Sequence, residues 1–321
     1  MNYLVRRLVR TLLLMIGVST LCFFLMQLAP GKFFDELRLN PQISAQTIAQ
    51  LNGRYGLDQP IVLRYLRWIR AAAAGDFGYS IAYNMPVASL LWTRAKHTLL
   101  LTGTATLLIW LIAVPVGVLA AAKRSVDKVI VAANSFLISM PEIVIAVGLL
   151  ALAVHSRMLP VGAMQSLGSE GLSSGAELRD LLLHMSLPVS ILVLLGLPFI
   201  TQHIRTSVIE VLDTPYIQAA RGLGIGPGRL LFRHALPVAA NPAISLFGFS
   251  LAGLLSGSLL VEVVTGWPGL GPLILEATLS RDLCVVVAGA MLSALLMIGG
   301  NFVADLMLIA SDPRIRTGAQ D

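Results

Sequence analysis

The stretch from residue 217 to residue 237, IQAARGLGIGPGRLLFRHALP, lies between two long apolar runs of the chain. It holds four glycines and three arginines. That composition suits a loop that cradles a nucleotide, an anchor at a membrane surface, or a docking element for another protein. The surroundings of the stretch separate these alternatives.

The chain has the composition of an integral membrane protein. Of its 321 residues, 56% are hydrophobic and 12% are charged, with a mean hydropathy of +0.80, which is more apolar surface than a soluble core buries. The net charge of +6 does not indicate nucleic-acid binding, because basic residues beside membrane spans encode orientation. Cys22 and Cys284 both lie in apolar runs, so we expect neither a disulfide framework nor a metal site.

Six apolar runs are long enough to cross a membrane, which takes about 20 residues. We therefore expect an all-α integral membrane protein with six transmembrane helices. The predicted spans are residues 9–28, 98–121, 129–154, 185–204, 242–265 and 284–309. The first run is too long for the apolar part of a signal peptide and a poor cleavage site follows it, so we interpret it as a retained helix.

The basic residues predict that both termini are cytoplasmic. With the N terminus inside, twelve basic residues near the spans fall on the inner side and five on the outer side. The inner ones are Arg6, Arg7, Arg10, Lys123, Arg124, Lys128, Arg205, Arg221, Arg229, Arg233, Arg314 and Arg316. Residues 1–8 and 310–321 then form cytoplasmic tails, residues 29–97 an outer segment, and residues 98–309 a transmembrane core that includes an inner loop at 205–241.

The outer segment shows two amphipathic helical periods, one before Gly53 and one from Ile61 to Ala71. In the second, Tyr65 and Trp68 alternate with arginines, which suits a helix lying at a membrane interface. A small helical cap packed on the outer mouth is the equal alternative. The Gly/Ser-rich loop at 155–184 predicts a mobile outer connection.

The nucleotide hypothesis for the opening stretch fails on detail. A Walker-type loop needs Gly-Lys-Ser/Thr, which the chain lacks, and the dinucleotide pattern would need glycine where Pro227 stands. The stretch instead predicts a helix that begins at Pro215 after the cap residues Asp213 and Thr214. Gly224 and Gly226 permit a positive φ where this helix ends.

A second helix follows, and we expect Pro237 to bend the chain toward the fifth span. The first helix carries a gently apolar face of small residues, formed by Ile217, Ala219, Ala220 and Leu223. Such a face accepts another protein closely, whereas a membrane anchor would show larger apolar residues. The pattern therefore favours a docking element.

Gln218-Ala219-Ala220, Gly224 and Leu236-Pro237 resemble the EAA loop of bacterial ABC-importer permeases. The chain is similar above all to the first permease subunit of the dipeptide/oligopeptide/nickel importers. It carries similar strings at 56–60 (GLDQP), 75–80 (GDFGYS), 267–271 (WPGLG) and 312–316 (DPRIR). Two positions depart from the pattern: Gln218 replaces an acidic residue, and His234 takes a usually hydrophobic position. We interpret His234 as part of a joint between loop and helix.

The resemblance implies a type I ABC-importer permease architecture in the bacterial cytoplasmic membrane. The EAA loop would be a coupling helix that docks on a separate ATPase subunit, with Gln218, Ala219, Ala220, Arg221 and Gly224 as the docking positions. The implied partners are a homologous second permease, two ATP-binding subunits, an extracytoplasmic substrate-binding protein and the lipid bilayer. Hydrolysis would belong to the ATPase, and we expect no catalytic residue, cofactor or metal in this chain.

Three questions stay open at this point. Peptides are the first expectation for the cargo, with nickel or another small solute as the alternative. A secondary transporter, or a structural assembly subunit or channel, would be the other classes of protein. Glu142 follows Pro141 within the third predicted span, where a carboxylate costs at least ~2.5 kcal/mol, and it either lines a substrate path or plays a structural role. Other polar residues of the spans are more typical of contacts between helices, namely Asn134, Glu262, Asn301 and Asp305.

Overall fold

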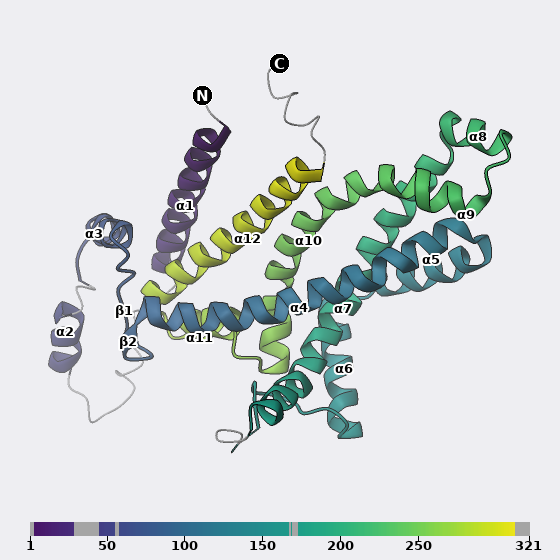
Figure 1. Cartoon of the computed structure of the whole chain (residues 1–321). Helices are drawn as coiled ribbons and strands as arrows, with labels where there is room; N and C mark the ends of the chain where they lie inside the picture. Colours follow the sequence, from purple (N-terminus) through teal and green to yellow (C-terminus); the bar gives the residue numbers. More distant parts are fainter. Residues whose placement is uncertain (1–2, 29–44, 55–57, 167, 169–172, 312–321) are drawn as a thin grey trace. The chain divides into compact units, whose positions relative to one another are not determined.

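The computed structural model describes residues 3–28, 45–54, 58–166, 168 and 173–311 (Figure 1). The predicted tail at 310–321 and the string DPRIR lie almost wholly outside these residues, as does the start of the outer segment. The chain forms two compact units. The first unit comprises Met1–His97 and Pro268–Leu295, and the second comprises Thr98–Trp267 and Leu296–Asp321.

Among the described residues, four helices are long and apolar enough to span a membrane, and counting each of two bent pairs as one span brings the number to six. The four are α1 (Tyr3–Leu28), α4 (Val87–Ala122), α7 (Ser174–Leu212) and α12 (Leu283–Ser311). The bent pairs are α5 (Arg124–Ser139) with α6 (Glu142–Ser156), and the two halves of α10 (Leu236–Thr265). All six lie where the apolar runs predict spans, which confirms the expected helical membrane fold.

We had expected residues 129–154 to form a single helix, but the third span consists of two. α5 and α6 meet at 98°, and the two residues between them, Met140 and Pro141, are extended. Proline disfavours a helical conformation in the residue before it, yet it suits the position at which a helix begins. Pro141 therefore ends α5 and allows α6 to begin, with Glu142 as its first residue.

The helix also continues through Pro237, where we had expected the chain to bend. A short helix α9 (Pro227–Arg229) leads into a π-helix, η2 (Leu230–Ala235), which continues into α10 without a break. Leu236 N–H donates to the carbonyl of Leu231, five residues back. This wider turn leaves room for a proline ring that would clash in a regular helix interior. The bend in α10 comes later, where Pro242–Gly248 and Gly253–Thr265 meet at 43°.

The core of the second unit lies among α4, α6, α7 and α10. Ile109 of α4 and Ile191 and Ile200 of α7 are almost fully buried in it. α4 and α7 approach closely at glycines: a Cβ on Gly117 would lie 3.0 Å from the carbonyl oxygen of Thr201, and one on Gly196 would lie 2.6 Å from Ile109 Cδ1. Small residues permit such close helix packing in membranes.

In the first unit, α3 (Ile61–Ala73) packs against α1. The Tyr65 hydroxyl lies 3.0 Å from Ser19 Oγ and 2.8 Å from Thr20 Oγ1, and buried Trp68 stacks near Phe23. The predicted amphipathic helices are confirmed as α2 (Ala45–Arg54) and α3, which begins directly after Pro60. The aromatic residues that suggested a membrane interface thus serve the contact with α1.

The first unit also holds two elements that the sequence did not predict. The strands β1 (Tyr79–Ser80) and β2 (Met85–Pro86) pair in antiparallel, and α11 (Leu270–Leu279) is a short apolar helix. Asp282 ties this region together: its Oδ2 accepts from Ser80 Oγ at 2.7 Å and from Ala82 N–H at 3.2 Å. Because its Oδ1 accepts from Val285 N–H at 3.4 Å, Asp282 also caps the start of α12.

Candidate functional site

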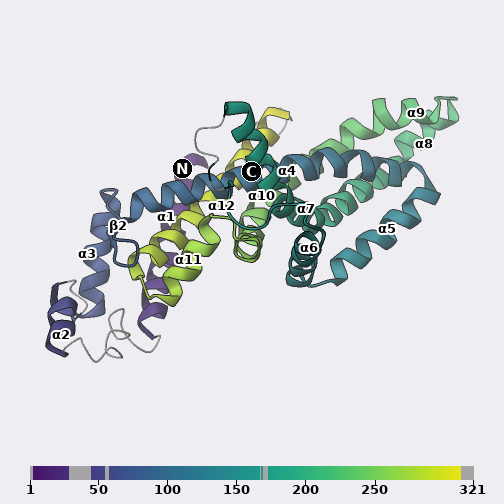
Figure 2. The same ribbon diagram turned by 90° about the horizontal axis from the view of Figure 1, so that it is seen from below.

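The EAA-like stretch folds into α8 (Pro215–Gly222), followed by a turn, α9 and η2. Both views place α8 and α9 together at one end of the second unit, away from α6 (Figure 1, Figure 2). The 39 residues of α7, at a rise of about 1.5 Å each, span roughly 58 Å. Since the hydrocarbon core is about 30 Å thick, α7 is longer than the distance needed to cross it.

α8 begins as the sequence predicts, although its cap differs. Pro215 lies in its first turn and Thr214 precedes it with extended backbone. No side chain caps the helix: Thr214 Oγ1 donates instead to the carbonyl of Val211 at 2.7 Å, and Gln218 Nε2 donates to the carbonyl of Asp213 at 3.2 Å. The two side chains therefore join α8 to the end of α7, where unpaired carbonyls are available.

The end of α8 confirms the prediction for Gly224 and contradicts it for Gly226. Gly224 has φ +80° and donates from its N–H to the carbonyl of Arg221 at 3.0 Å, while Ile225 N–H donates to that of Ala220 at 3.4 Å. These two bonds form a Schellman ending, which needs one left-handed residue. Gly226 has φ −63°, because the single positive φ at Gly224 already turns the chain.

A small apolar core holds the loop together. Its buried members are Ile217, Ala220, Leu230 and Ala235, and Val211, Leu212 and Ile225 pack around them. Ala220 is 8% exposed. Of the predicted docking positions, Ala220 thus supports the loop from inside, so a partner would not contact it.

Pro215, Tyr216 and Gly222 of α8 are exposed. So are Gln218, Ala219 and Arg221, together with Leu223 directly after the helix, and we call these four the α8 face. Ala219 and Leu223 are four residues apart and therefore lie on one side of the helix. Leu223 is 83% exposed, although the loop has an apolar core in which a leucine could be buried. We had expected Ile217, Ala219, Ala220 and Leu223 to lie together on one docking face. The structure divides this set: Ile217 and Ala220 are buried, whereas Ala219 and Leu223 are exposed.

His234 lies in η2, at the joint that we expected. Its Nδ1 is 2.7 Å from the hydroxyl oxygen of Tyr216, and the two rings meet edge to face with centroids 6.1 Å apart. This pair joins the first turn of α8 to the last residues of η2.

Glu142 lies on a different element from the α8 face and is exposed. As the first residue of α6, its carboxylate stands at a helix N-terminus, which favours a negative charge. The third predicted span is broken at this point, so Glu142 lies at the corner between two helices and not in the interior of one. Asn134 and Glu262 are buried in α5 and α10, but Asn134 Nδ2 has no hydrogen-bond partner among the described residues, so the predicted polar contact between helices is not shown for it.

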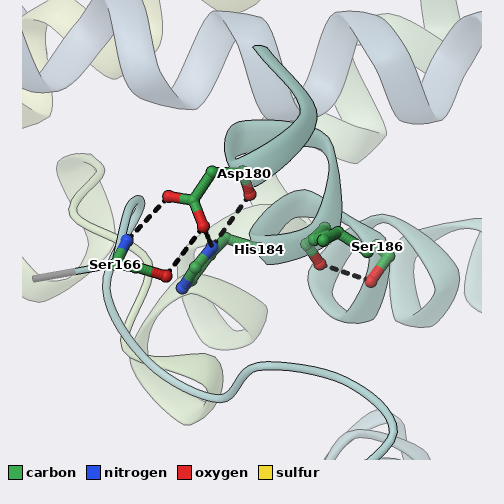
Figure 3. Close-up of polar contacts among 5 residues, drawn as sticks. Ser166, Asp180, His184 and Ser186 are labelled. Carbon is green, nitrogen blue, oxygen red and sulfur yellow. Dashed lines mark hydrogen bonds and ion pairs between the residues drawn. The ribbon is translucent and has the colours of Figure 1, made fainter. Parts of the chain in front are cut away.

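The Gly/Ser-rich segment between α6 and α7, which the sequence predicts to be mobile, lies partly outside the described residues, but Ser166 at its start bonds to α7. Ser166 donates to the Asp180 carboxylate from both its N–H and its hydroxyl, at 2.7 Å each (Figure 3). His184 Nδ1 lies 2.9 Å from the backbone oxygen of Asp180 (Figure 3). Across the described ranges, no three His, Cys, Asp or Glu side chains form a group that could hold a metal ion.

Comparison with known proteins matches almost the whole chain. The family of binding-protein-dependent transport system inner membrane components matches residues 113–317. The N-terminal family of the same kind of transport-system membrane component matches residues 1–102.

Several curated relatives align end to end. The chain is 33% identical over 318 residues to the oligopeptide transport system permease protein AppB of Bacillus subtilis, covering 98% of each chain. It is 32% identical over 339 residues to the dipeptide transport system permease protein DppB of Escherichia coli K12, covering 98% of this chain and 99% of that one. An inward-facing structure of the MetNI methionine ABC transporter aligns with a TM-score of 0.55 at 19% identity, over 70% of this chain and 96% of that chain, which shows the fold.

Proposed function

This chain belongs to the family of binding-protein-dependent transport system inner membrane components, and we propose that its α8 face couples transport to ATP hydrolysis. As a member, it is a multi-pass inner-membrane permease subunit of an ABC importer of the dipeptide/oligopeptide family, and it works with ATP-binding and substrate-binding components. The importer assignment replaces the alternatives of a secondary transporter and a structural channel subunit.

The observation that carries the proposal is the exposure of the α8 face over a core of its own. Ile217 and Ala220 hold α8 in place from beneath, so Ala219 and Leu223 are left for a partner. The small side chain of Ala219 allows close approach of a second backbone, and Leu223 supplies an apolar anchor of the kind that dominates protein interfaces when buried. Arg221 adds a charge at the edge, and Gly224 turns the chain away from the contact.

In the proposed mechanism α8 docks in a groove of an ATP-binding subunit. When two such subunits close on ATP, the docked helices move and the membrane helices change between outward-open and inward-open arrangements. One chain carries one α8, so two ATP-binding subunits require a second, homologous permease, which forms the other half of the path. This arrangement places α8 and both termini in the cytoplasm.

The proposed cargo is a di- or oligopeptide, because the relatives that align end to end are named oligopeptide and dipeptide permeases. Nickel or another small solute is the alternative within the same family. We further propose that Glu142 lines the path, where its exposed carboxylate would meet a peptide amine or a metal cation. A structural role at the break between α5 and α6 is the competing interpretation.

The test replaces residues of the α8 face and measures docking directly. Ala219→Asp and Leu223→Ser should each weaken the affinity of the permease for the ATP-binding subunit about a hundredfold, because a charge or a lost anchor in a desolvated contact costs about 2–3 kcal/mol. Less ATP-binding subunit should then co-purify with the permease. Leu279→Ser is the matched control, since Leu279 is also a highly exposed leucine (70%) but lies in α11. Normal co-purification and uptake by both α8 variants would show that α8 is not the coupling element.

A further inference from the structure

His234 lies in η2, the element that connects the loop containing α8 to α10. It is the fifth of the six residues of η2, and η2 continues into α10 with no break. α10 carries the fifth predicted span. A force applied at His234 is therefore transmitted along a continuous helix, whereas the turn from Leu223 to Gly226 separates α8 from the same helix in the chain.

The apolar contacts between α8 and η2 do not by themselves define how the two are oriented. They involve Ile217 and Ala220 on α8 and Leu230 and Ala235 on η2, and two of these four side chains are single methyl groups. Dispersion contacts are individually weak and have no preferred direction. Such a contact keeps α8 close to η2 but resists rotation or sliding weakly.

The Tyr216–His234 hydrogen bond is directional and therefore restrains the orientation of α8 relative to η2. The hydroxyl oxygen and Nδ1 are 2.7 Å apart, a normal length for a strong neutral bond, and the edge-to-face rings add a second geometric restraint. The bond spans 18 residues of sequence, from the second residue of α8 to the end of η2. The bond thus connects the start of α8 directly to η2, and we call it the brace.

We propose that Tyr216 and His234 are positioning residues that brace α8 against η2 and so determine how much of the movement of α8 reaches α10. The inference rests on the proposed role of α8 in coupling. Histidine at position 234 departs from the hydrophobic residue of the EAA pattern, and it is this departure that gives the hydroxyl of Tyr216 its partner.

The experiment uses the complete importer in liposomes, with its second permease, ATP-binding subunits and binding protein, and a mixture of labelled di- and tripeptides as the probe. The quantity measured is the number of peptides imported per ATP hydrolysed. Tyr216→Phe and His234→Leu should each lower this ratio about two- to tenfold, which is what the net worth of one hydrogen bond corresponds to. The double variant should lose no more than either single one, because the two residues act as one unit.

Two further variants separate positioning from simple destabilisation. His234→Asn should retain most of the wild-type ratio, because the side-chain amide can accept or donate a hydrogen bond near the position of Nδ1. Tyr79→Phe is the matched control: it removes an exposed tyrosine hydroxyl that bonds to Asn84 at 3.0 Å in the first unit, and it should change nothing.

Co-purification of the ATP-binding subunit distinguishes this inference from the proposed function. The brace variants should bind it as the wild type does, since the α8 face is intact in them. Loss of binding in Tyr216→Phe or His234→Leu would mean that the pair serves docking and would overturn the brace. An unchanged ratio of peptide to ATP, or additive losses in the double variant, would overturn it too. Failure of the proposed function itself would appear as normal binding by Ala219→Asp and Leu223→Ser.

Discussion

Two helices of the second unit, α8 and α10, are each followed by a glycine with a positive φ, but the two turns have different surroundings. α8 ends at Gly224 with φ +80°, and α10 ends at Gly266 with φ +70°. In both, the residue after the glycine donates to a carbonyl five residues back, Ile225 to Ala220 at 3.4 Å and Trp267 to Glu262 at 2.9 Å. The local chemistry is the same, so any difference in function comes from the surroundings.

Those surroundings differ sharply. A Cβ on Gly266 would lie 3.3 Å from the Cα of Gly162, and Trp267 after it is only 1% exposed. A Cβ on Gly224 would meet nothing within 4 Å, and Leu223 before it is 83% exposed. Gly266 is thus required by conformation and by packing inside the chain. Gly224 is required by conformation alone, because no other part of the described chain packs against it.

The largest expected effect is that of Gly266→Val. The variant combines a positive φ in a β-branched residue, at about 1–2 kcal/mol, with a steric conflict worth a further ~1–3 kcal/mol. We expect a loss of about 3 kcal/mol in the free energy of unfolding of the second unit, seen as a lower melting temperature in detergent. A wild-type melting temperature would mean that the contact with Gly162 does not constrain the turn.

Ala220→Asp should have the next largest effect, and it should be local. The carboxylate would be forced into the apolar core under α8, at about 2–3 kcal/mol if it stays unpaired. Hydrogen–deuterium exchange should speed up over residues 215–235 while the melting temperature of the second unit stays near that of the wild type. Ala219→Asp, one residue away but exposed, is the control and should leave exchange in the loop unchanged.

Gly224→Val should cost less, about 1–2 kcal/mol, because only the backbone is strained. Membrane insertion and overall stability should be those of the wild type, whereas ATP-driven uptake should fall. The comparison with Gly266→Val is the check: equal losses of melting temperature in both variants would show that the two turns are equally embedded in the core, contrary to the difference described above.

Glu142→Gln should have the smallest effect and should leave assembly of the importer intact. If Glu142 lines the path, removing its charge should change uptake of peptides a fewfold, as the loss of one exposed charge contact worth up to ~1 kcal/mol would. The measurement is uptake by reconstituted importer across a range of pH, at matched amounts of assembled complex. Unchanged uptake throughout that range would assign Glu142 to the structural role.

The features that the sequence predicted correctly depend on local rules. Apolar runs of about 20 residues marked the four long helices and the two bent pairs, a 3.6-residue period marked α3, and a glycine after a short helix marked the turn at Gly224. In each case a few neighbouring residues determine the structure, so tertiary contacts do not need to be known.

The features that were missed depend on contacts between distant residues. Ser166 bonds to Asp180, 14 residues later in the chain, and Asp282 bonds to a hairpin 200 residues earlier. The π-helix at η2 absorbs Pro237, and the sequence held no sign of it. The two faces of α8 were also mixed, because alanine suits a buried position as well as an exposed one; burial of Ala220 and exposure of Ala219 become apparent only when η2 is in place.

The break between α5 and α6 has a consequence for how the third span sits among its neighbours in the bilayer. The first N–H groups of α6 and the last carbonyls of α5 have no partners within their own helices. In hydrocarbon, each such group left unsatisfied costs several kcal/mol, so irregular backbone at membrane depth occurs where protein or water can solvate it. For a corner within the hydrocarbon, Met140 and Pro141 would therefore have to point away from lipid, toward another helix or a wet cavity. A bilayer that tolerates no unpaired peptide groups would then determine which way this span is turned.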